Sequence, residues 1–357
     1  SRIVSNSGSR IARFIRIINN ESKVRKIKQM QNRKPRVVVT RKLPEIVQVR
    51  LNELFDTSLN NTDEPFSRDQ LVNAVRESDI LVPTVGDKID SSLLALAGKN
   101  FKLIANYGAG YDHIDVKTAM ARGIMVTNTP GVSASDTADI AMALILALPR
   151  RMKEGADRIT DDTWEGWKPT ALLGNRISGK RLGILGMGRI GRKVAARASA
   201  FGMEIIYHNR RQIHPEIETE LSAVFYENLN TMLPDLDILS IHTPHTPDTF
   251  HLIDSNRLNL LNSSAFIVNT ARGEVIDQKA LIRSLRAKKI AGAGLDVYEG
   301  GRNVSPELKT FKNVLLLPHM SSATVEGRIE MGEKVIVNIK TLADGHRPPD
   351  QVLPSML

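Results

Sequence analysis

From residue 35 onward, short apolar runs alternate with longer stretches in which apolar residues recur at helical spacing. The apolar runs have the length and composition of buried strands and lie at residues 36–40, 80–82, 102–105 and 125–127. The stretches between them have helical periodicity, as at residues 45–55, 67–77 and 91–97. Strands that alternate with helices in this way predict a parallel sheet covered by helices.

A second series of the same kind follows a helical stretch that begins near Ser133 and runs to Leu148. Ser133 and Asp136 have the spacing of a capping box, with Asp in place of Glu or Gln. Six more apolar runs predict the strands of a second parallel sheet: 181–185, 204–208, 238–241, 265–269, 293–297 and 314–317. The last helical pattern, 324–342, is long enough to link back to the first unit.

We therefore predict an α/β protein with two Rossmann-like, doubly wound parallel-sheet domains, one inserted into the other. The outer domain consists of residues 35–130 and 318–357, and the inserted domain consists of residues 131–317. Residues 1–34 precede both as a basic N-terminal extension.

Composition and charge narrow the class of protein. The 357 residues include no cysteine, which excludes a disulfide framework and thiolate chemistry. No uncharged apolar run approaches the ~20 residues of a membrane-spanning helix. The net charge is +10, but residues 1–34 hold ten Lys and Arg against the single acid Glu21, so the rest of the chain is nearly neutral. We therefore expect neither a nucleic-acid nor a membrane partner.

The basic extension has three interpretations. It has the Arg- and Ser-rich, acid-poor composition of a mitochondrial transit peptide. It is also consistent with an upstream extension before a natural start at Met30, or with a basic arm for an acidic surface. The expected location is the cytoplasm, or the mitochondrial matrix if residues 1–34 are a transit peptide.

A glycine-rich loop joins the predicted strand 181–185 to the helical pattern 192–201. Gly186 permits a tight turn, Gly188 lets the backbone approach a pyrophosphate, and Gly191 lets helix and strand pack closely. The following helix supplies free N–H groups and a positive dipole end. This strand–loop–helix context predicts a dinucleotide site formed by Gly186, Met187, Gly188, Arg189, Ile190 and Gly191.

The next predicted strand ends at Asn209, Arg210 and Arg211. An NAD enzyme usually has an acidic residue here, which binds the ribose 2′-hydroxyl. The two arginines instead suit the 2′-phosphate of NADP, which an acid would repel. We therefore predict NADP(H) in preference to NAD(H), with a solvated basic turn as the alternative interpretation.

Two residues at strand ends are candidates for catalysis. Arg272 follows the predicted strand 265–269, and His319 follows the predicted strand 314–317. The carboxyl ends of sheet strands face the ligand crevice, where a guanidinium binds a carboxylate and an imidazole transfers a proton near neutral pH. Together with a dinucleotide loop, this pair is consistent with hydride transfer.

Two other features have less specific chemistry. The glycines of Gly108-Ala109-Gly110 expose backbone N–H groups suited to a small carboxylate, or form a simple strand-to-helix turn. His242, His245 and His251 fall close together, but without thiolate or carboxylate partners they predict no metal site. The strand before His242 makes this residue a candidate wall of an adenine pocket.

These motifs, in this order along one chain, resemble those of the D-isomer-specific 2-hydroxyacid dehydrogenase family, most closely its bacterial glyoxylate/hydroxypyruvate reductases. The resemblance covers roughly residues 36–357. Its motifs are the glycine-rich loop 185–191, together with residues 107–115, 242–247, 269–277, 292–297 and 317–319.

The resemblance implies a split substrate domain, an inserted cofactor domain and a homodimer built on the cofactor domain. It implies NADPH-dependent reduction of glyoxylate or hydroxypyruvate to the D-2-hydroxy acid, with another 2-oxo acid as the close alternative. Arg272 would bind the substrate and His319 would act as general acid and base. The resemblance also implies roles for substrate residues Val85, Ala109 and Gly110, for cofactor residues Thr137, Thr243, Pro244 and Asp296, and for Trp167 at the neighbour's active site.

One position departs from the family pattern. The family pairs its histidine with a Glu five residues after the position of Asp296, and this chain has Gly301 there, followed by Arg302. That acid orients the imidazole and favours its charged form. Glu299 is two residues early and would substitute if the loop shifts. The alternative function is therefore a catalytically weakened NADP(H)-binding sensor or partner-binding module.

Overall fold

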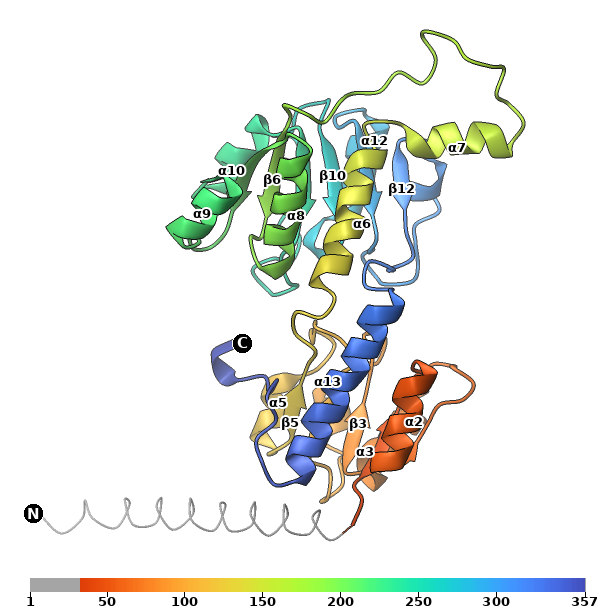
Figure 1. Cartoon of the computed structure of the whole chain (residues 1–357), viewed down its shortest axis with the longest axis vertical. Coiled ribbons are helices and arrows are strands. Elements are labelled where there is room, and N and C mark those ends of the chain that lie inside the picture. Colours follow the sequence, from red (N-terminus) through yellow and green to blue (C-terminus); the bar gives the residue numbers. More distant parts are fainter. Residues whose placement is uncertain (1–32, 357) are drawn as a thin grey trace, which may run out of the picture. The chain divides into compact units, whose positions relative to one another are not determined.

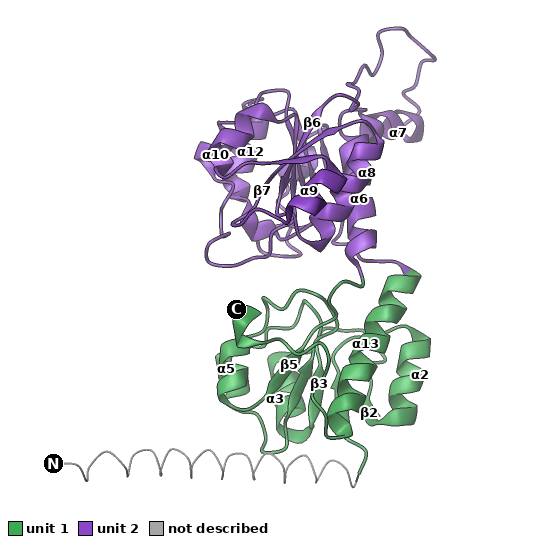
Figure 2. Cartoon of the chain, turned by 60° about the vertical axis from the view of Figure 1, so that its left-hand side comes forward, with its two compact units in different colours: residues 1–132, 325–357 green, residues 133–324 purple. Residues whose placement is uncertain are grey.

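The computed structural model describes residues 33–356 and divides the chain into two compact units. Unit 1 comprises residues 1–132 and 325–357, and unit 2 comprises residues 133–324 (Figures 1 and 2). Two α/β units, one inserted into the other, agree with the fold predicted from the sequence pattern.

Unit 1 is built on a five-stranded parallel sheet in the order β2-β1-β3-β4-β5. Its strands are β1 (Arg36–Val39), β2 (Asp56–Ser58), β3 (Ile80–Val82), β4 (Leu103–Ala105) and β5 (Met125–Thr127). Its helices are α2 (Glu45–Leu54), α3 (Arg68–Glu77), α4 (Ser91–Leu94), α5 (Val116–Ala121) and α13 (Val325–Ala343), with the short turn η4 (Pro354–Met356).

Both faces of this sheet are covered. Residues of α2 and α13, such as Leu51 and Ile339, form one apolar cluster with the sheet. Residues of α3, α4 and α5, such as Val75 and Leu93, form another. Burial on both faces explains the continuous apolar character of the strands, as at Ile80–Val82.

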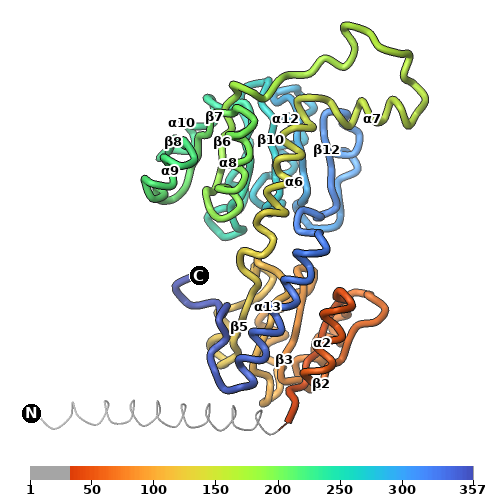
Figure 3. Tube along the Cα trace, viewed as in Figure 1, coloured from red at the N-terminus to blue at the C-terminus, as the bar shows by residue number. Residues whose placement is uncertain are grey.

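Unit 2 contains a seven-stranded sheet in the order β12-β11-β10-β9-β6-β7-β8, with every pairing parallel. Its strands are β6 (Arg181–Leu185), β7 (Glu204–His208), β8 (Ala223–Phe225), β9 (Ile238–Ile241), β10 (Phe266–Asn269), β11 (Gly292–Leu295) and β12 (Val314–Leu316). The strand order reverses at β6, whose neighbours are β7 and β9. Figure 3 shows β6 and β7 next to each other in the sheet. Ligands of open α/β sheets bind at the carboxyl ends of strands at such a switch point.

The helices of unit 2, except the exposed α7, lie on both faces of this sheet (Figure 1). They are α6 (Ala134–Ala147), α7 (Met152–Thr160), α8 (Arg189–Ala200), α9 (Pro215–Leu221), α10 (Leu229–Met232), α11 (Ser255–Leu258) and α12 (Gln278–Arg286). The short turns are η1 (Leu233–Asp235), η2 (Gly273–Val275) and η3 (Leu308–Thr310). Each face of the sheet has its own apolar cluster. One includes residues of α6 and α8, and the other includes residues of α10, α11 and α12.

The unit boundaries differ from the prediction. The second boundary lies after residue 324 rather than after residue 317, and the first lies after residue 132 rather than 130. The reason for the second difference is local: Asp296 of unit 2 accepts hydrogen bonds from the backbone N–H of Met320 and of Ser321. These bonds keep the segment after β12 with unit 2.

The predicted capping box at Ser133 is wrong. Ser133 is the N-cap residue of α6, but its side chain caps no N–H group. The Asp136 carboxylate instead accepts a 3.0 Å hydrogen bond from Thr324 Oγ1. This contact joins the start of the inserted unit to its end.

The basic extension lies outside the described residues except for Arg33 and Lys34. Arg33 forms two 2.8 Å hydrogen bonds with the buried carboxylate of Asp79, and Lys34 donates to the backbone oxygen of Glu53. These two residues therefore belong to unit 1 rather than to an extension. Within residues 33–356, no helix combines the length and the apolar character that crossing a membrane requires. The cytoplasmic location stays a prediction.

Candidate active site

The glycine-rich loop of unit 2 follows β6 and has the geometry of a phosphate cradle. Gly186 has φ +99°, and a Cβ there would lie 2.8 Å from the backbone of His242. A Cβ on Gly191 would lie 2.2 Å from the Gly186 carbonyl oxygen, whereas Gly188 faces open space. Gly188 is the N-cap of α8, and no side chain caps the N-terminus of this helix. The loop therefore leaves room and N–H groups for a pyrophosphate.

The residues after β7 continue this site. Asn209 Oδ1 accepts a 2.8 Å hydrogen bond from Met187 N, so Asn209 braces the glycine loop. Arg210 and Arg211 are exposed, and neither forms an ion pair or a side-chain hydrogen bond with any residue that the structure describes. Two such guanidinium groups beside the loop suit a phosphate group.

A cavity of about 490 Å³ opens at the end of β7, and the sequence pattern did not predict it. His208, the last residue of β7, lines it, and its Nδ1 lies 2.9 Å from the Tyr226 carbonyl oxygen. The other lining residues are Glu227, Asn228, Leu229, Leu252 and Arg257. The only sequence signal for this cavity is its position at a strand end next to the dinucleotide loop.

His242 lies at the carboxyl end of β9, between the glycine loop and the sheet. The backbone N–H of His242 donates to the Leu185 carbonyl oxygen, and the Nε2 atom of its ring lies 2.8 Å from Ser240 Oγ. Burial lowers the pKa of His242 to about 3, so the imidazole is neutral at physiological pH. Its backbone lies directly behind Gly186, so His242 forms part of the wall of the cradle.

Two polar atoms beside the cradle are buried without a protein partner, His242 Nδ1 and Thr243 Oγ1, and Thr270 Oγ1 after β10 is another such atom of unit 2. Thr243 also lies close to Gly186, since a Cβ on Gly186 would be 3.0 Å from Thr243 Cγ2. Buried polar groups normally have hydrogen-bond partners. Orphaned polar atoms beside a cradle of N–H groups are what a bound dinucleotide would satisfy, so the residues present fit this cofactor.

The remaining predicted cofactor residues lie in the same unit. Thr137 is buried in the first turn of α6, and Pro244 is exposed after β9. Asp296 is fully buried and its carboxylate binds the backbone after β12. Within residues 33–356, no group of three or more His, Cys, Asp or Glu side chains is arranged to hold a metal ion.

Arg272 follows β10 in a loop fixed by Asn269. The Asn269 side chain donates to the Arg272 carbonyl oxygen at 2.9 Å and accepts from Ala271 N at 3.0 Å. The Arg272 Nη1 atom donates to the Ala271 carbonyl oxygen. A Cβ on Gly273 would lie 1.9 Å from the backbone of Tyr298, so only glycine allows this close approach. The backbone after Arg272 thus packs directly against the segment that contains Glu299.

His319 has a left-handed backbone, with φ +54°, which is uncommon for a residue other than glycine. The contacts that hold it lie on both sides. Tyr298 Oη donates to the Leu317 carbonyl oxygen at 2.7 Å, and Asp296 accepts from Met320 N at 2.8 Å and from Ser321 N at 2.9 Å. Because strained backbone persists only where its surroundings fix it, these contacts explain how the main chain at His319 keeps this conformation.

Glu299 does not take the place of the missing family acid. Its carboxylate accepts from His251 Nε2 at 2.7 Å and from Gln278 N at 3.2 Å. Gly300 and Gly301 have φ values of +81° and +72°, and open space surrounds the Cβ position of each. Glu299 is therefore paired with His251, and the loop that follows it contains two glycines in the left-handed conformation.

The predicted substrate residues other than Arg272 lie in unit 1, in two loops that follow neighbouring strands. Val85 is half exposed in the loop after β3, and Ala109 is exposed in the loop after β4 with Gly110 beside it. The Pro83 carbonyl oxygen accepts from Tyr107 N at 2.9 Å, which ties the two loops together. They therefore form one patch at the carboxyl edge of the sheet.

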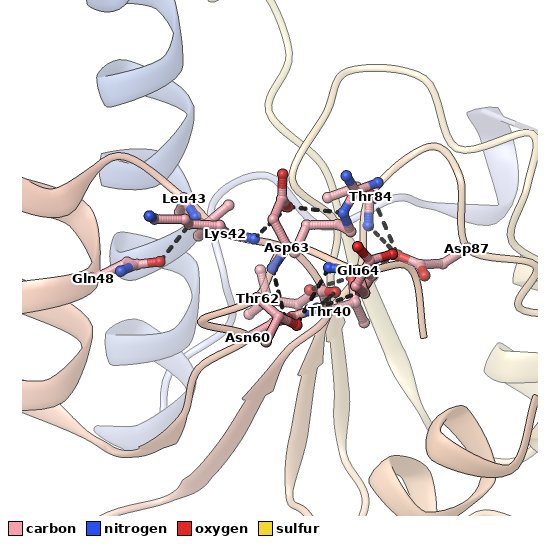
Figure 4. A network of polar contacts seen from close by, with 12 residues as sticks. Thr40, Lys42, Leu43, Gln48, Asn60, Thr62, Asp63, Glu64, Thr84 and Asp87 are labelled. Carbon is pink, nitrogen blue, oxygen red and sulfur yellow. Dashed lines mark hydrogen bonds and ion pairs between the residues drawn. The ribbon is translucent and has the colours of Figure 1, made fainter. Parts of the chain in front are cut away.

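A polar network fixes the Val85 loop to the end of β1 (Figure 4). The buried Asp87 accepts hydrogen bonds from Thr84 N at 2.8 Å and from Thr40 Oγ1 at 2.5 Å. The side-chain amide of Asn60 donates to the Thr40 and Glu64 carbonyl oxygens, both at 2.7 Å. Val85 is thus presented by a loop whose ends are anchored.

Comparisons with known proteins identify the family of this chain. The family model for the D-isomer specific 2-hydroxyacid dehydrogenase, NAD binding domain, matches residues 142–321. The glyoxylate reductase of Thermococcus litoralis is 44% identical over 323 residues, which cover 89% of this chain and 97% of that protein. The glyoxylate reductase of Korarchaeum cryptofilum is 42% identical, with coverage of 89% and 96%.

Solved structures show the same similarity. The TT0316 protein from Thermus thermophilus has a TM-score of 0.82 at 40% identity and covers 89% of this chain and 100% of that chain. The NADPH-dependent glyoxylate/hydroxypyruvate reductase from Sinorhizobium meliloti, in complex with NADP and malonate, has a TM-score of 0.79 at 33% identity, with coverage of 89% and 97%. The chain is therefore an oxidoreductase of the D-isomer-specific 2-hydroxyacid dehydrogenase family, with a nicotinamide-dinucleotide-binding domain.

Proposed function

We propose that the protein reduces glyoxylate or hydroxypyruvate to the corresponding D-2-hydroxy acid with NADPH. The observation that carries this proposal is the 44% identity to a glyoxylate reductase across nearly the whole of both chains. The placement of Arg272 and His319 supports it, because both follow the carboxyl ends of strands in the unit that contains the dinucleotide cradle.

Arg272 binds the substrate carboxylate and polarises the neighbouring carbonyl. In unit 1, the N–H groups of Ala109 and Gly110 are the proposed donors for a substrate carboxylate. His319 donates its proton to the carbonyl oxygen as C2 gains a hydride, and the neutral imidazole then takes up a proton from solvent. A nicotinamide dinucleotide, when bound, supplies that hydride to C2.

NADPH is the proposed cofactor because of the groups after β7. No acid follows this strand, and the exposed Arg210 and Arg211 have no partner among the described residues. The named Sinorhizobium meliloti relative is NADPH-dependent. An acidic residue at Asn209, Arg210 or Arg211 would instead favour NADH.

We propose a homodimer built on unit 2. Helix α7 buries none of its residues, although Met152 and Ile159 on it are apolar and more than half exposed. Trp164 and Trp167 follow it and are 58% and 83% exposed. Large apolar side chains gathered in one segment normally mark an interface. Light scattering is expected to give the mass of a dimer.

An absorbance assay of NADPH oxidation with glyoxylate and with hydroxypyruvate tests the proposed function. We expect turnover by the unmodified protein, a large loss in His319→Ala and in Arg272→Ala, and little change in the control Arg283→Ala, an arginine of α12. Turnover in both active-site variants equal to that of the unmodified protein would contradict the assigned roles.

Gly301 favours one alternative function, a catalytically weakened NADP(H)-binding protein, because it leaves out the family acid. Tight NADPH binding measured by fluorescence, together with no turnover of any 2-oxo acid, would favour this alternative. Turnover that depends on His319 would exclude it.

A further inference from the structure

A single buried side chain holds the glycine loop of unit 1 from one side. Asn106 follows β4 and is 1% exposed. Its Nδ2 atom donates to the Gly108 carbonyl oxygen at 3.0 Å and to the Gly110 carbonyl oxygen at 2.8 Å. Its Oδ1 atom lies 2.9 Å from His113 Nε2. The amide therefore uses both of its donor hydrogens and its acceptor within one loop.

The loop's other carbonyl contacts also go to the body of unit 1. The Gly108 carbonyl oxygen accepts a second bond, from Thr129 N at 3.0 Å, and the Ala109 carbonyl oxygen accepts from Asn128 Nδ2 at 2.7 Å. Every carbonyl of residues 108–110 therefore has a protein donor. Within residues 33–356, the N–H groups of residues 108–110 donate to no protein acceptor. The loop thus keeps its acceptors occupied and its donors available, as an anion site requires.

The far end of the loop is fixed as well. Ile89 N donates to the His113 carbonyl oxygen at 3.0 Å, and Asp115 N donates to the Ile89 carbonyl oxygen at 2.8 Å. His113, which contacts Asn106, is thus anchored to the segment that follows the Val85 loop. Asn106 connects this anchored end to the two glycine carbonyls, so it determines the path of residues 108–110.

We propose that Asn106 is a positioning residue that sets the N–H groups of Ala109 and Gly110 to bind the carboxylate of the 2-oxo acid. This inference rests on the proposed function. Glycines otherwise allow the loop many backbone conformations, and binding would then have to order it. The Asn106 amide fixes one of these conformations before the substrate arrives.

Steady-state kinetics with Asn106→Ala and Asn106→Asp test this inference. We expect KM for glyoxylate to rise about 10- to 100-fold in Asn106→Ala, with kcat changed by less than about threefold and KM for NADPH unchanged. Asn106→Asp keeps the acceptor for His113 but turns a carboxylate oxygen toward two carbonyls. We expect its KM to rise at least as much.

The matched control is Asn338→Ala. Asn338 is a fully buried asparagine of unit 1 whose side-chain hydrogen bonds go to Lys334 and Asp350. Loss of stability alone would affect both alanine variants alike. An equal rise in KM for Asn338→Ala, or an unchanged KM for Asn106→Ala, would overturn the inference.

Calorimetric binding of oxamate, a 2-oxo acid analogue that is not reduced, separates this inference from the proposed function. Weaker oxamate binding by Asn106→Ala than by the unmodified protein supports the inference, whether or not glyoxylate is turned over. Equal oxamate affinity in both proteins overturns it, even if glyoxylate reduction is confirmed.

Discussion

The Glu299 carboxylate lies 2.7 Å from Nε2 of His251 and also accepts a hydrogen bond from Gln278 N. The His251 ring stacks on Phe250 with 4.0 Å between ring centroids. Glu299 is therefore committed to a contact between two loops of unit 2. The carboxylate closest in sequence to the family's acid position is thus not the partner of His319.

We predict that Glu299→Gln leaves the pH profile of turnover unchanged. The pair with His251 is about one-third exposed on each side, so its loss should lower the free energy of unfolding by no more than about 1 kcal/mol. Parallel measurements of kcat against pH and of thermal unfolding check this prediction. A shift of the alkaline limb would show instead that Glu299 acts on His319.

Gly301→Glu is predicted to raise activity and to extend it to higher pH. A carboxylate beside an imidazole favours the protonated form, which is the form that donates a proton to the substrate. The Cβ position of Gly301 is in open space, and its φ of +72° should cost a side chain about 1–2 kcal/mol.

Gly300→Glu is a matched control for this prediction. Gly300 has φ +81°, and open space surrounds its Cβ position as well. Gly300→Glu therefore adds the same charge and a similar backbone strain one residue away from Gly301. We expect a higher kcat in Gly301→Glu alone, measured from acidic to alkaline pH. An equal gain in both variants would point to a general effect of charge.

The sequence was most informative where burial controls residue choice. Apolar runs such as 80–82 and 125–127 coincide with strands because both faces of each sheet are covered. Two strands at ends of the sheet orders were missed, β2 and β8, whereas the opposite end strands, β5 and β12, were predicted. Strand β2 consists of Asp56, Thr57 and Ser58, none of them buried, and β8 has one buried residue among three. Edge strands like these carry little hydrophobic signal.

At the candidate active site, too, some features follow from a local sequence pattern and others do not. The glycine spacing predicts a cradle, and the φ of Gly186 and the close packing at Gly191 explain why glycine is needed there. The pairing of Glu299 with His251 joins residues 48 positions apart in two loops. No local pattern of residues encodes such a contact, so only the three-dimensional structure reveals it.

Asp296→Asn is predicted to lower kcat about 10- to 100-fold. Asp296 is fully buried and binds the two N–H groups that follow His319, and an amide nitrogen in place of one oxygen would face an N–H donor. Asp254→Asn, which changes a helix cap of α11 in the same unit, is the control for lost stability. Equal losses of kcat in the two variants would contradict a role for Asp296 in positioning His319.

Replacing Arg210 and Arg211 together by serine is predicted to weaken NADPH binding at least about tenfold and to leave NADH binding nearly unchanged. Both guanidinium groups are exposed beside the glycine loop. Arg176→Ser removes another exposed arginine of unit 2 and is the control for net charge. Fluorescence titration of each protein with both cofactors measures the ratio of the NADPH affinity to the NADH affinity. If the double variant has the same ratio as the unmodified protein, the NADP preference is contradicted.

His242 is predicted to make unit 2 sensitive to acid. Its pKa is about 3 in the folded protein and about 6.5 when unfolded, so below about pH 6.5 only the unfolded state binds this proton. Stability is therefore lost as the pH falls from about 6.5 toward 3. Between about pH 7.5 and about pH 5 the loss from this group should be about 2 kcal/mol.

His242→Gln removes the titrating group and keeps a polar side chain near Ser240. We expect denaturant unfolding of the cofactor-free protein to show a smaller loss of stability toward acid pH in this variant. His214→Gln is the control, because it removes a histidine of the same unit whose side chain is 65% exposed. If the unmodified protein and His242→Gln lose equal stability between about pH 7.5 and about pH 5, His242 is not the buried neutral imidazole that its position indicates.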